Sequence, residues 1–210
     1  MTGNCSVPSA ASTCLSLQNE HPPIGLIALF FGAACFLTIQ WRYGKITDIF
    51  LSEKVKKMKE VNGNLEAKGM KIALVASRFN SFLVEQLVKG AVDAFVRLGG
   101  DEKNLMLVRV PGAYELPVVV KSLAKSKKYD AVVAMGAVVQ GATAHAGLIN
   151  ETTARAFTEI ALETGVPVTD GIVNAENLEQ AVERCGTKQG NKGFSAMQAA
   201  IETVNVLKGL

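Results

Sequence analysis

The sequence predicts an α/β protein built as a three-layer α/β/α sandwich, in which a four-stranded parallel sheet lies between two layers of helices. From residue 71 onward, short apolar runs alternate with longer amphipathic segments, which is typical of repeated βαβ units. The run at residues 131–136 is apolar throughout, as a parallel strand buried on both faces should be. The 210 residues are enough for one domain of about 150 residues and an additional segment.

The first half of the predicted domain holds two strands, each followed by a helix. We expect these four elements, in chain order, at residues 71–76, 81–98, 105–110 and 115–126. The first helix is indicated by apolar side chains that recur with a helical period, namely Phe82, Val84, Leu87, Val88, Ala91, Ala94 and Phe95. Pro111 and Gly112 turn the chain from the second strand into the second helix.

The second half follows the same alternation and ends with two helices. Its elements are expected at residues 131–136, 149–163, 166–173, 178–184 and 193–207. Ligands of such sheets bind outside the carboxyl ends of the strands. The segments that follow these ends are 77–80, 111–115, 137–145 and 174–176.

The charge of the chain does not suggest a nucleic-acid partner. The whole chain has a formal net charge of +3, and residues 1–57 hold five basic and three acidic side chains. This leaves 17 basic and 16 acidic side chains for residues 58–210, a net charge of +1. A nucleic-acid-binding domain normally shows a clustered basic face, so we expect no nucleic-acid partner.

Neither a metal nor a nucleotide cofactor is predicted. The sequence contains no G-x-G-x-x-G motif and no P-loop motif. The four cysteines form no C-x-x-C pair, and three of them precede residue 58, so neither a zinc site nor a disulfide framework is indicated. We therefore expect a reducing compartment and a cytoplasmic protein.

Three interpretations of residues 1–57 stay open. They form a loosely packed extension, or they are upstream sequence before a start of translation at Met58, or they hold an apolar anchor at 24–41. The apolar part of that segment is shorter than the roughly 20 residues that cross a bilayer. We favour a start at Met58, with a domain at 58–210, and expect membrane contact only through 24–41.

Two short motifs indicate a site for an anionic small molecule. The segment 141–145, Gly-Ala-Thr-Ala-His, follows a predicted strand and opens a helix, so its backbone N–H groups suit a phosphate or an oxyanion. His145 lies beside these groups and can transfer protons near neutral pH. The segment 184–193, with Arg184, Lys188 and Lys192, offers cations.

Each of these residues also has a plain structural interpretation. Thr143 can cap a helix, and Glu115 can do the same for the second helix. Phe79 is an aromatic residue of the kind that usually lies in a core. Arg184 and the lysines near it can be an ordinary solvated helix end, and Asp170 can be a surface acid.

Four motifs, taken together and in order, resemble the 6,7-dimethyl-8-ribityllumazine synthase family of riboflavin biosynthesis. They are the segments 78–80, 111–117, 141–145 and 183–193, and the resemblance runs from about Met58 to Leu210. It implies a flavodoxin-like domain that assembles into pentamers, often twelve of them in a 60-subunit icosahedral shell, with sites between neighbouring subunits. The family condenses 5-amino-6-(D-ribitylamino)uracil with 3,4-dihydroxy-2-butanone 4-phosphate, releases phosphate and water, and needs no cofactor.

The resemblance also implies roles for individual residues. On the uracil side, Phe79 lies against the pyrimidine ring with Asn80 nearby, and Lys192 is a candidate for the pyrimidine carbonyl. The remaining contacts to this substrate are Ala113, Tyr114, Glu115, Ala137, Val138 and Val139, of which Ala113 and Glu115 meet the ribityl chain.

On the phosphate side, the backbone N–H groups of Ala142 and Thr143 hold the phosphate together with Arg184 from the adjacent subunit. His145 is the proton shuttle.

The chain departs from the family pattern at three places. Residues 146–148 are Ala-Gly-Leu where the family usually has an aromatic residue, an acid and a tyrosine, and Gln140 stands where an arginine often lies. Asp170 replaces a phenylalanine that stacks on the pyrimidine from across the interface. Loss of a stacking ring costs on the order of 1 kcal/mol. The alternative is therefore a catalytically weakened or inactive relative that forms shells or binds ligands.

Overall fold

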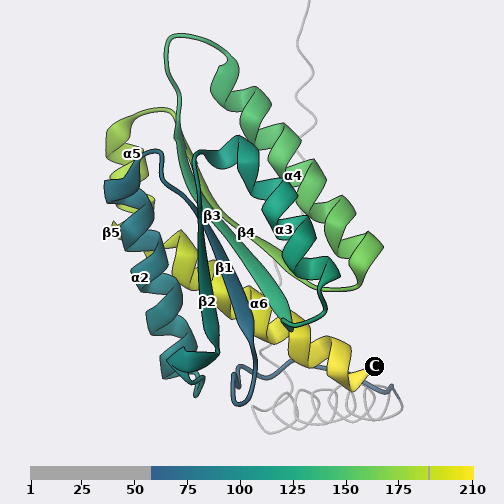
Figure 1. The fold of residues 1–210 in the computed structure, drawn as a ribbon. Helices are drawn as coiled ribbons and strands as arrows, with labels where there is room; N and C mark the ends of the chain where they lie inside the picture. Colours follow the sequence, from purple (N-terminus) through teal and green to yellow (C-terminus); the bar gives the residue numbers. More distant parts are fainter. Residues whose placement is uncertain (1–57, 189) are drawn as a thin grey trace, which may run out of the picture. The chain divides into compact units, whose positions relative to one another are not determined.

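The computed structural model describes residues 58–188 and 190–210. Its centre is a sheet of four parallel strands in the order β2-β1-β3-β4 (Figure 1). The strands are β1 (Ile72–Ser77), β2 (Leu105–Val110), β3 (Ala131–Val139) and β4 (Val168–Ala175). This sheet confirms the predicted α/β class.

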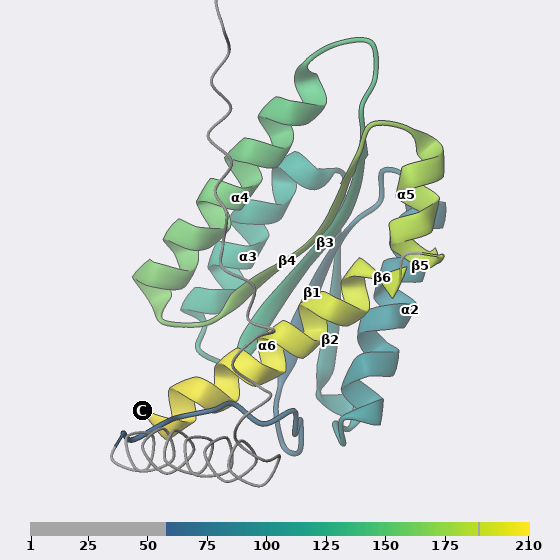
Figure 2. The ribbon, with the colours of Figure 1, turned by 180° about the vertical axis from the view of Figure 1, so that it is seen from behind.

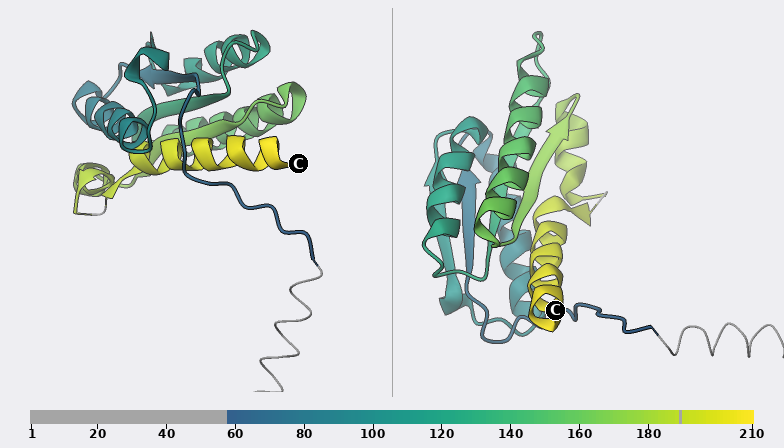
Figure 3. Two further views of the ribbon diagram at one scale, coloured as in Figure 1. Left: turned by 90° about the horizontal axis from the view of Figure 1, so that it is seen from below. Right: turned by 90° about the vertical axis from the view of Figure 1, so that its right-hand side faces the viewer.

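Helices cover both faces of the sheet, which completes the three predicted layers (Figures 1 and 2). One face carries α2 (Ser81–Arg97) and α6 (Lys192–Gly209), and the other carries α3 (Leu116–Lys125) and α4 (His145–Thr164). Figure 3 shows the same layers from below and from the side. The short elements are the 3-10 turns η1 (Glu102–Asn104) and η2 (Ala113–Glu115), the helix α5 (Leu178–Arg184), and the strands β5 (Cys185–Thr187) and β6 (Gly190–Asn191).

Strand β1 shows why the sheet lies in the middle. All six of its residues are buried. Because side chains alternate between the faces of a strand, Ile72 and Leu74 pack toward α2 and α6, whereas Ala73 and Val75 pack toward α3 and α4. The chain therefore builds two apolar cores, one on each face of the sheet.

Strand β3 is longer than the sequence predicts. It continues through Val139, because Ala137, Val138 and Val139 keep pairing with β4 up to Ala175. The sequence predicts a loop at these three residues, but they belong to the strand itself. Their apolar side chains are what a strand buried by helices requires.

The elements after β3 also differ in their bounds. Helix α4 begins at His145 rather than at residue 149, because Ala146 is already buried against the sheet. Strand β4 begins at Val168 rather than at 166, since Pro167 has no N–H for a ladder and only its carbonyl pairs, with the N–H of Val132. The hairpin of β5 and β6, between α5 and α6, was not predicted.

The predictions for residues 1–57, which are the extension, the upstream sequence and the apolar anchor at 24–41, lie outside the described residues. Within the part of the chain that the structure describes, no helix combines the length and the apolar character needed to span a bilayer.

Two glycines let α6 lie directly against α2. A Cβ atom on Gly193 would lie 2.1 Å from the carbonyl oxygen of Leu87, and a Cβ atom on Gly90 would lie 2.4 Å from the side chain of Asn191. A contact this short with backbone cannot be relieved by a rotamer change, so larger residues would push the two helices apart.

We expect Gly193→Ala to destabilise the domain by about 1–3 kcal/mol, because the added methyl group would collide with the α2 backbone. The matched control is Gly147→Ala in α4, where a Cβ atom would have no neighbour within 4 Å. This control is expected to be neutral or to stabilise by up to about 1 kcal/mol, the usual gain of alanine over glycine in a helix. Urea unfolding of both variants measures the difference, and equal effects would contradict the proposed close approach.

Candidate active site

A cavity of about 520 Å³ opens at the carboxyl ends of β1, β2 and β3, beside the first turn of α4. Its location is the one expected for a ligand site in this class of sheet. The predicted site residues that line it are Phe79, Ala113, Tyr114, Glu115, Ala137, Val138, Val139, Thr143 and His145. The structure adds Ser77, Pro111, Gly112, Gly141, Ala146 and Ile149 to this lining.

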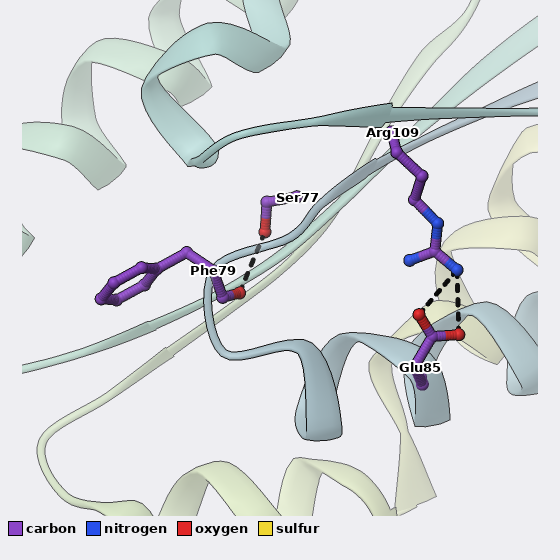
Figure 4. Close-up of polar contacts among 4 residues, drawn as sticks. All are labelled: Ser77, Phe79, Glu85 and Arg109. Atoms are coloured by element: carbon purple, nitrogen blue, oxygen red, sulfur yellow. Dashed lines mark hydrogen bonds and ion pairs between the residues drawn. The ribbon is translucent and has the colours of Figure 1, made fainter.

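The loop after β1 presents Phe79 to the cavity. The N–H of Arg78 donates to the carbonyl of Val110 (2.8 Å), and the N–H of Phe79 donates to the carbonyl of Pro111 (3.0 Å). Pairing with the β2 segment thus continues past the end of the strand. The Phe79 side chain is 71% exposed, so it is not a core residue. Figure 4 shows its ring pointing away from the ion pair of Glu85 and Arg109.

Asn80 connects this loop to the central strand. Its backbone is left-handed, with a φ of 56°, and it precedes the first turn of α2. Its side-chain Nδ2 donates to the carbonyl of Ala137 in β3 (2.9 Å). The amide therefore holds the loop that carries Phe79, and Asn80 is not among the residues that line the cavity. Its predicted contact with the substrate stays a prediction.

Glu115 closes the turn on the opposite wall. Its Oε2 accepts a hydrogen bond from the N–H of Gly112 (2.8 Å), so the side chain caps the short turn η2. Glu115 is also the N-cap residue of α3, but its side chain makes no capping hydrogen bond there, so the interpretation that it caps the second helix is wrong. A carboxylate has several acceptor positions, so this bond leaves capacity for a ligand. Tyr114, in the same turn, is 62% exposed. Both side chains are thus available to a bound molecule.

The N-terminus of α4 faces the same cavity. Its N-cap residue is Ala144, which has no side-chain acceptor, so the prediction that Thr143 caps the helix is wrong. The first N–H groups of a helix have no intrahelical partner and carry the positive end of the dipole. His145 is the first residue of this helix of 20 residues and lines the cavity. Proton transfer and anion binding are therefore available side by side.

Gln140 braces the turn that leads to this helix. Its Nε2 donates to the carbonyls of Gly141 (3.0 Å) and Thr143 (2.5 Å), and its backbone N–H donates to the carbonyl of Ala175 (2.8 Å). Ala142 lies between the two bonded carbonyls. The glutamine thus takes a structural role at a place where the family pattern often has a cation.

The predicted cations lie elsewhere in the chain. Arg184, at the end of α5, lines a second cavity of about 460 Å³ together with Asn174, Ala175, Glu176, Gln180 and Glu183. Lys192 is the first residue of α6. No lysine or arginine is among the described residues that line the first cavity. One chain by itself therefore does not bring His145 and Arg184 to the same cavity.

Asp170 also lies outside the first cavity. It is exposed on β4, an edge strand of the sheet, and its Oδ1 accepts from the N–H of Ile172 (2.8 Å). This position agrees with the interpretation of Asp170 as a surface acid of the single chain. Any contact between Asp170 and a ligand in the first cavity would have to come from another subunit.

Two residues of the cavity lining are not among the predicted site residues: Ala146 lies before the predicted start of the helix at residue 149, and Ile149 lies within the predicted helix. The earlier start of the helix was indicated by helical spacing, since Ala146, Thr153, Phe157, Ile160 and Thr164 recur with this period and are all buried in α4.

Among residues 58–188 and 190–210, no group of three His, Cys, Asp or Glu side chains is arranged to hold a metal ion.

The fold and the cavity together define an α/β protein with a candidate small-molecule site at the carboxyl ends of its parallel strands. A helix N-terminus and a histidine face this cavity, which is otherwise lined mainly by apolar and aromatic residues. Residues 69–208 match the family model described as 6,7-dimethyl-8-ribityllumazine synthase. The chain belongs to this family.

Similar curated proteins support this assignment. A 6,7-dimethyl-8-ribityllumazine synthase of Nitratidesulfovibrio vulgaris (strain DP4) is 47% identical over 153 residues, which cover 73% of this chain and 98% of that protein. One of Chlorobium phaeobacteroides (strain BS1) is 49% identical over 151 residues, which cover 72% of this chain and 97% of that protein.

Cys185, which follows Arg184, is a buried thiol whose titration can be tested. Burial raises its pKa from the ordinary 9.0 to about 11. Folding therefore favours the protonated thiol, and this contribution to stability is complete below pH 9 and is lost as the pH rises toward about 11.

We expect the free energy of unfolding to fall more steeply between about pH 8 and about pH 10 in the wild type than in Cys185→Ala, which lacks the thiol. Urea unfolding of both proteins at the two pH values measures the slopes. Parallel slopes would show that the Cys185 thiol ionises in the folded protein as it does in the unfolded chain.

Proposed function

We propose that this protein condenses 5-amino-6-(D-ribitylamino)uracil with 3,4-dihydroxy-2-butanone 4-phosphate to 6,7-dimethyl-8-ribityllumazine, a transferase reaction of riboflavin biosynthesis. The observation that carries the proposal is the match of residues 69–208 to the family together with a cavity lined by residues of three of the four motifs, 78–80, 111–117 and 141–145. The curated relatives named 6,7-dimethyl-8-ribityllumazine synthase support it.

The proposed reaction is a series of proton transfers. The 5-amino group attacks the ketone and loses water to give an imine, and removal of a proton from the adjacent carbon then lets phosphate leave by elimination. The enol that forms takes up a proton and becomes a second ketone, and the ribitylamino nitrogen attacks this carbonyl and loses a second water to close the ring. We assign the proton transfers to His145, because a positioned imidazole that acts as general acid and base typically contributes about 10²–10⁴-fold to such steps. No step of this scheme requires a cofactor.

The phosphate is proposed to bind at the N-terminus of α4. The backbone N–H groups of Ala142 and Thr143 and the helix dipole favour an anion there. The cation for this site is proposed to be Arg184 of an adjacent subunit, since the lining of the first cavity holds no lysine or arginine among the described residues. The fork of a guanidinium donates two hydrogen bonds to one phosphate.

The uracil is proposed to bind between Phe79 and the end of β3. Phe79 offers an exposed ring for stacking, and Ala137, Val138 and Val139 form an apolar wall. The ribityl chain is assigned to the turn Ala113–Glu115, and Lys192 of an adjacent subunit is a candidate for the pyrimidine carbonyl.

This assignment requires an oligomer. We propose a pentamer, or a 60-subunit shell built from pentamers, in the cytoplasm. Native mass spectrometry of the intact protein distinguishes the two assemblies. A monomer that is fully active would contradict the proposed shared site.

The alternative is a shell-forming or ligand-binding relative without turnover, which Asp170 and the segment 146–148 suggest. The similar proteins do not favour it, because they carry the name of the enzyme. Mixing the two substrates with the purified protein and following the absorbance of the lumazine decides between them. The enzyme forms product in proportion to protein concentration, whereas a scaffold leaves the absorbance unchanged.

We expect His145→Ala to lower kcat by about 10²–10⁴-fold with a smaller effect on KM, because it removes the proposed proton shuttle and leaves the binding surfaces in place. Steady-state lumazine formation measures both constants. Partial recovery of the rate with added imidazole would support the assignment, and an unchanged kcat would move proton transfer to another group.

We expect Asp170→Phe to raise the affinity for the uracil by about fivefold, equivalent to a stacking contribution on the order of 1 kcal/mol. Asp170→Asn is the matched control, because it removes the charge without adding a ring. Equilibrium binding of the uracil to the assembled protein measures both variants. Unchanged affinity in Asp170→Phe would mean that residue 170 does not reach the bound pyrimidine.

A further inference from the structure

The side chain of Asn191 uses its whole amide to join three elements of the fold. Its Nδ2 donates to the carbonyl of Gln86 in α2 (2.8 Å) and to the carbonyl of Cys185 at the end of α5 (3.2 Å). Its Oδ1 accepts from the N–H of Phe194 in the first turn of α6 (3.1 Å). An asparagine amide offers two N–H groups and one carbonyl oxygen, and each of these has a protein partner here.

Two glycines, Gly90 and Gly186, leave the space that the Asn191 side chain occupies. A Cβ atom on Gly90 would lie 2.4 Å from the Asn191 amide, and a Cβ atom on Gly186 would lie 3.0 Å from its Nδ2. The backbones of α2 and of the hairpin therefore approach the amide more closely than any larger residue would allow. Figure 2 shows α2, α5, β5, β6 and the start of α6 gathered at this end of the molecule.

The carbonyl of Cys185, to which Asn191 donates, lies next in the chain to Arg184, the residue that we propose binds the phosphate. Cys185 directly follows Arg184, and its backbone pairs with Asn191 across the hairpin. The hairpin is tied back to α5 by the hydroxyl of Thr187, which donates to the carbonyl of Val182 (3.0 Å). The Arg184 side chain is exposed, so its direction depends on how firmly the last turn of α5 is held.

We propose that Asn191 is a positioning residue of the active site, which holds the last turn of α5 so that Arg184 is presented to the phosphate-bearing substrate in the adjacent subunit. This inference rests on the proposed function, because the role of Arg184 belongs to it. Asn191 itself does not contact the substrate. It acts through the carbonyl of Cys185, and α2 provides the rigid support.

The chemistry of the amide provides a selective variant. In Asn191→Asp the carboxylate keeps the acceptor for Phe194, so the cap of α6 remains, but the two donations are lost and an anion faces two carbonyl oxygens. We expect the KM for 3,4-dihydroxy-2-butanone 4-phosphate to rise about tenfold or more, since displacement of a positioned group by about 1 Å costs up to roughly 10²-fold. The dissociation constant of inorganic phosphate should rise in parallel, while the KM for the uracil changes less.

The matched control is Asn205→Asp at the other end of α6. The Nδ2 of Asn205 also donates to two backbone carbonyls, those of Asn64 (2.7 Å) and Glu66 (3.1 Å), so the same substitution removes the same kind of bonds far from Arg184. The melting temperature and native mass of each variant are measured alongside. We expect Asn205→Asp to leave the KM for the phosphorylated substrate unchanged.

A double-mutant cycle separates positioning from general structural support. If Asn191 acts through Arg184, Asn191→Asp should add little to the KM of an Arg184→Ala protein, because the group that it positions is gone. An unchanged KM in the single variant, or the same fold-rise in KM with and without Arg184, would overturn the inference. If Asn191→Asp does not assemble, Asn191→Ser, which keeps a capping oxygen and adds no charge, takes its place in the same cycle.

The outcome for the wild type keeps this test distinct from the test of the proposed function. A wild-type protein that forms no lumazine refutes the proposed function. A wild type that is active, with an Asn191→Asp variant of unchanged KM, refutes only the role given to Asn191.

Discussion

The parallel pairing of β1 with both of its neighbours is the constraint on which the rest of the molecule depends. Ile72 pairs with Leu105 on one side and with Ala131 on the other, so the three strands run in step and end at the same edge. Since every residue of β1 is buried, a shift of one residue would move each side chain to the opposite core, where the helices are packed around a different residue. The loops that follow the strands are thereby held around one cavity.

Hydrogen bonds beyond the strand ends refine this arrangement. Asn80 links the first loop to β3, Glu115 closes the second, and Gln140 braces the third. Each uses a polar side chain to satisfy backbone groups that the ladder leaves unpaired. The result is a cavity whose walls are set by backbone, with Phe79, Tyr114 and His145 exposed on them.

The same organisation separates the groups that we propose to bind phosphate, which lie at two different cavities of one chain. The helix N-terminus and the histidine belong to the edge that follows β3, whereas Arg184 lies at the end of α5 and lines a separate cavity. An enzyme of this family that uses both groups on one ligand must bring them from different subunits. Under the proposed function, the direction of the Arg184 side chain depends on how firmly its own subunit holds the end of α5, and Asn191 is hydrogen-bonded to that end.

The sequence by itself determined the fold class, the order of the main elements and most of the cavity lining. Apolar periodicity and turn-forming Gly and Pro residues indicate these features locally, without any knowledge of tertiary contacts. It did not determine the length of β3, the early start of α4 or the β5–β6 hairpin, which depend on pairing with distant residues such as Ala175 and on burial of Ala146. Only the tertiary structure decided that Asn80 and Asn191 bond to backbone rather than face solvent, and that Arg184 lies apart from His145. These contacts depend on which groups lie close together in the folded chain. The local sequence pattern does not indicate a hydrogen-bond partner that lies many residues away.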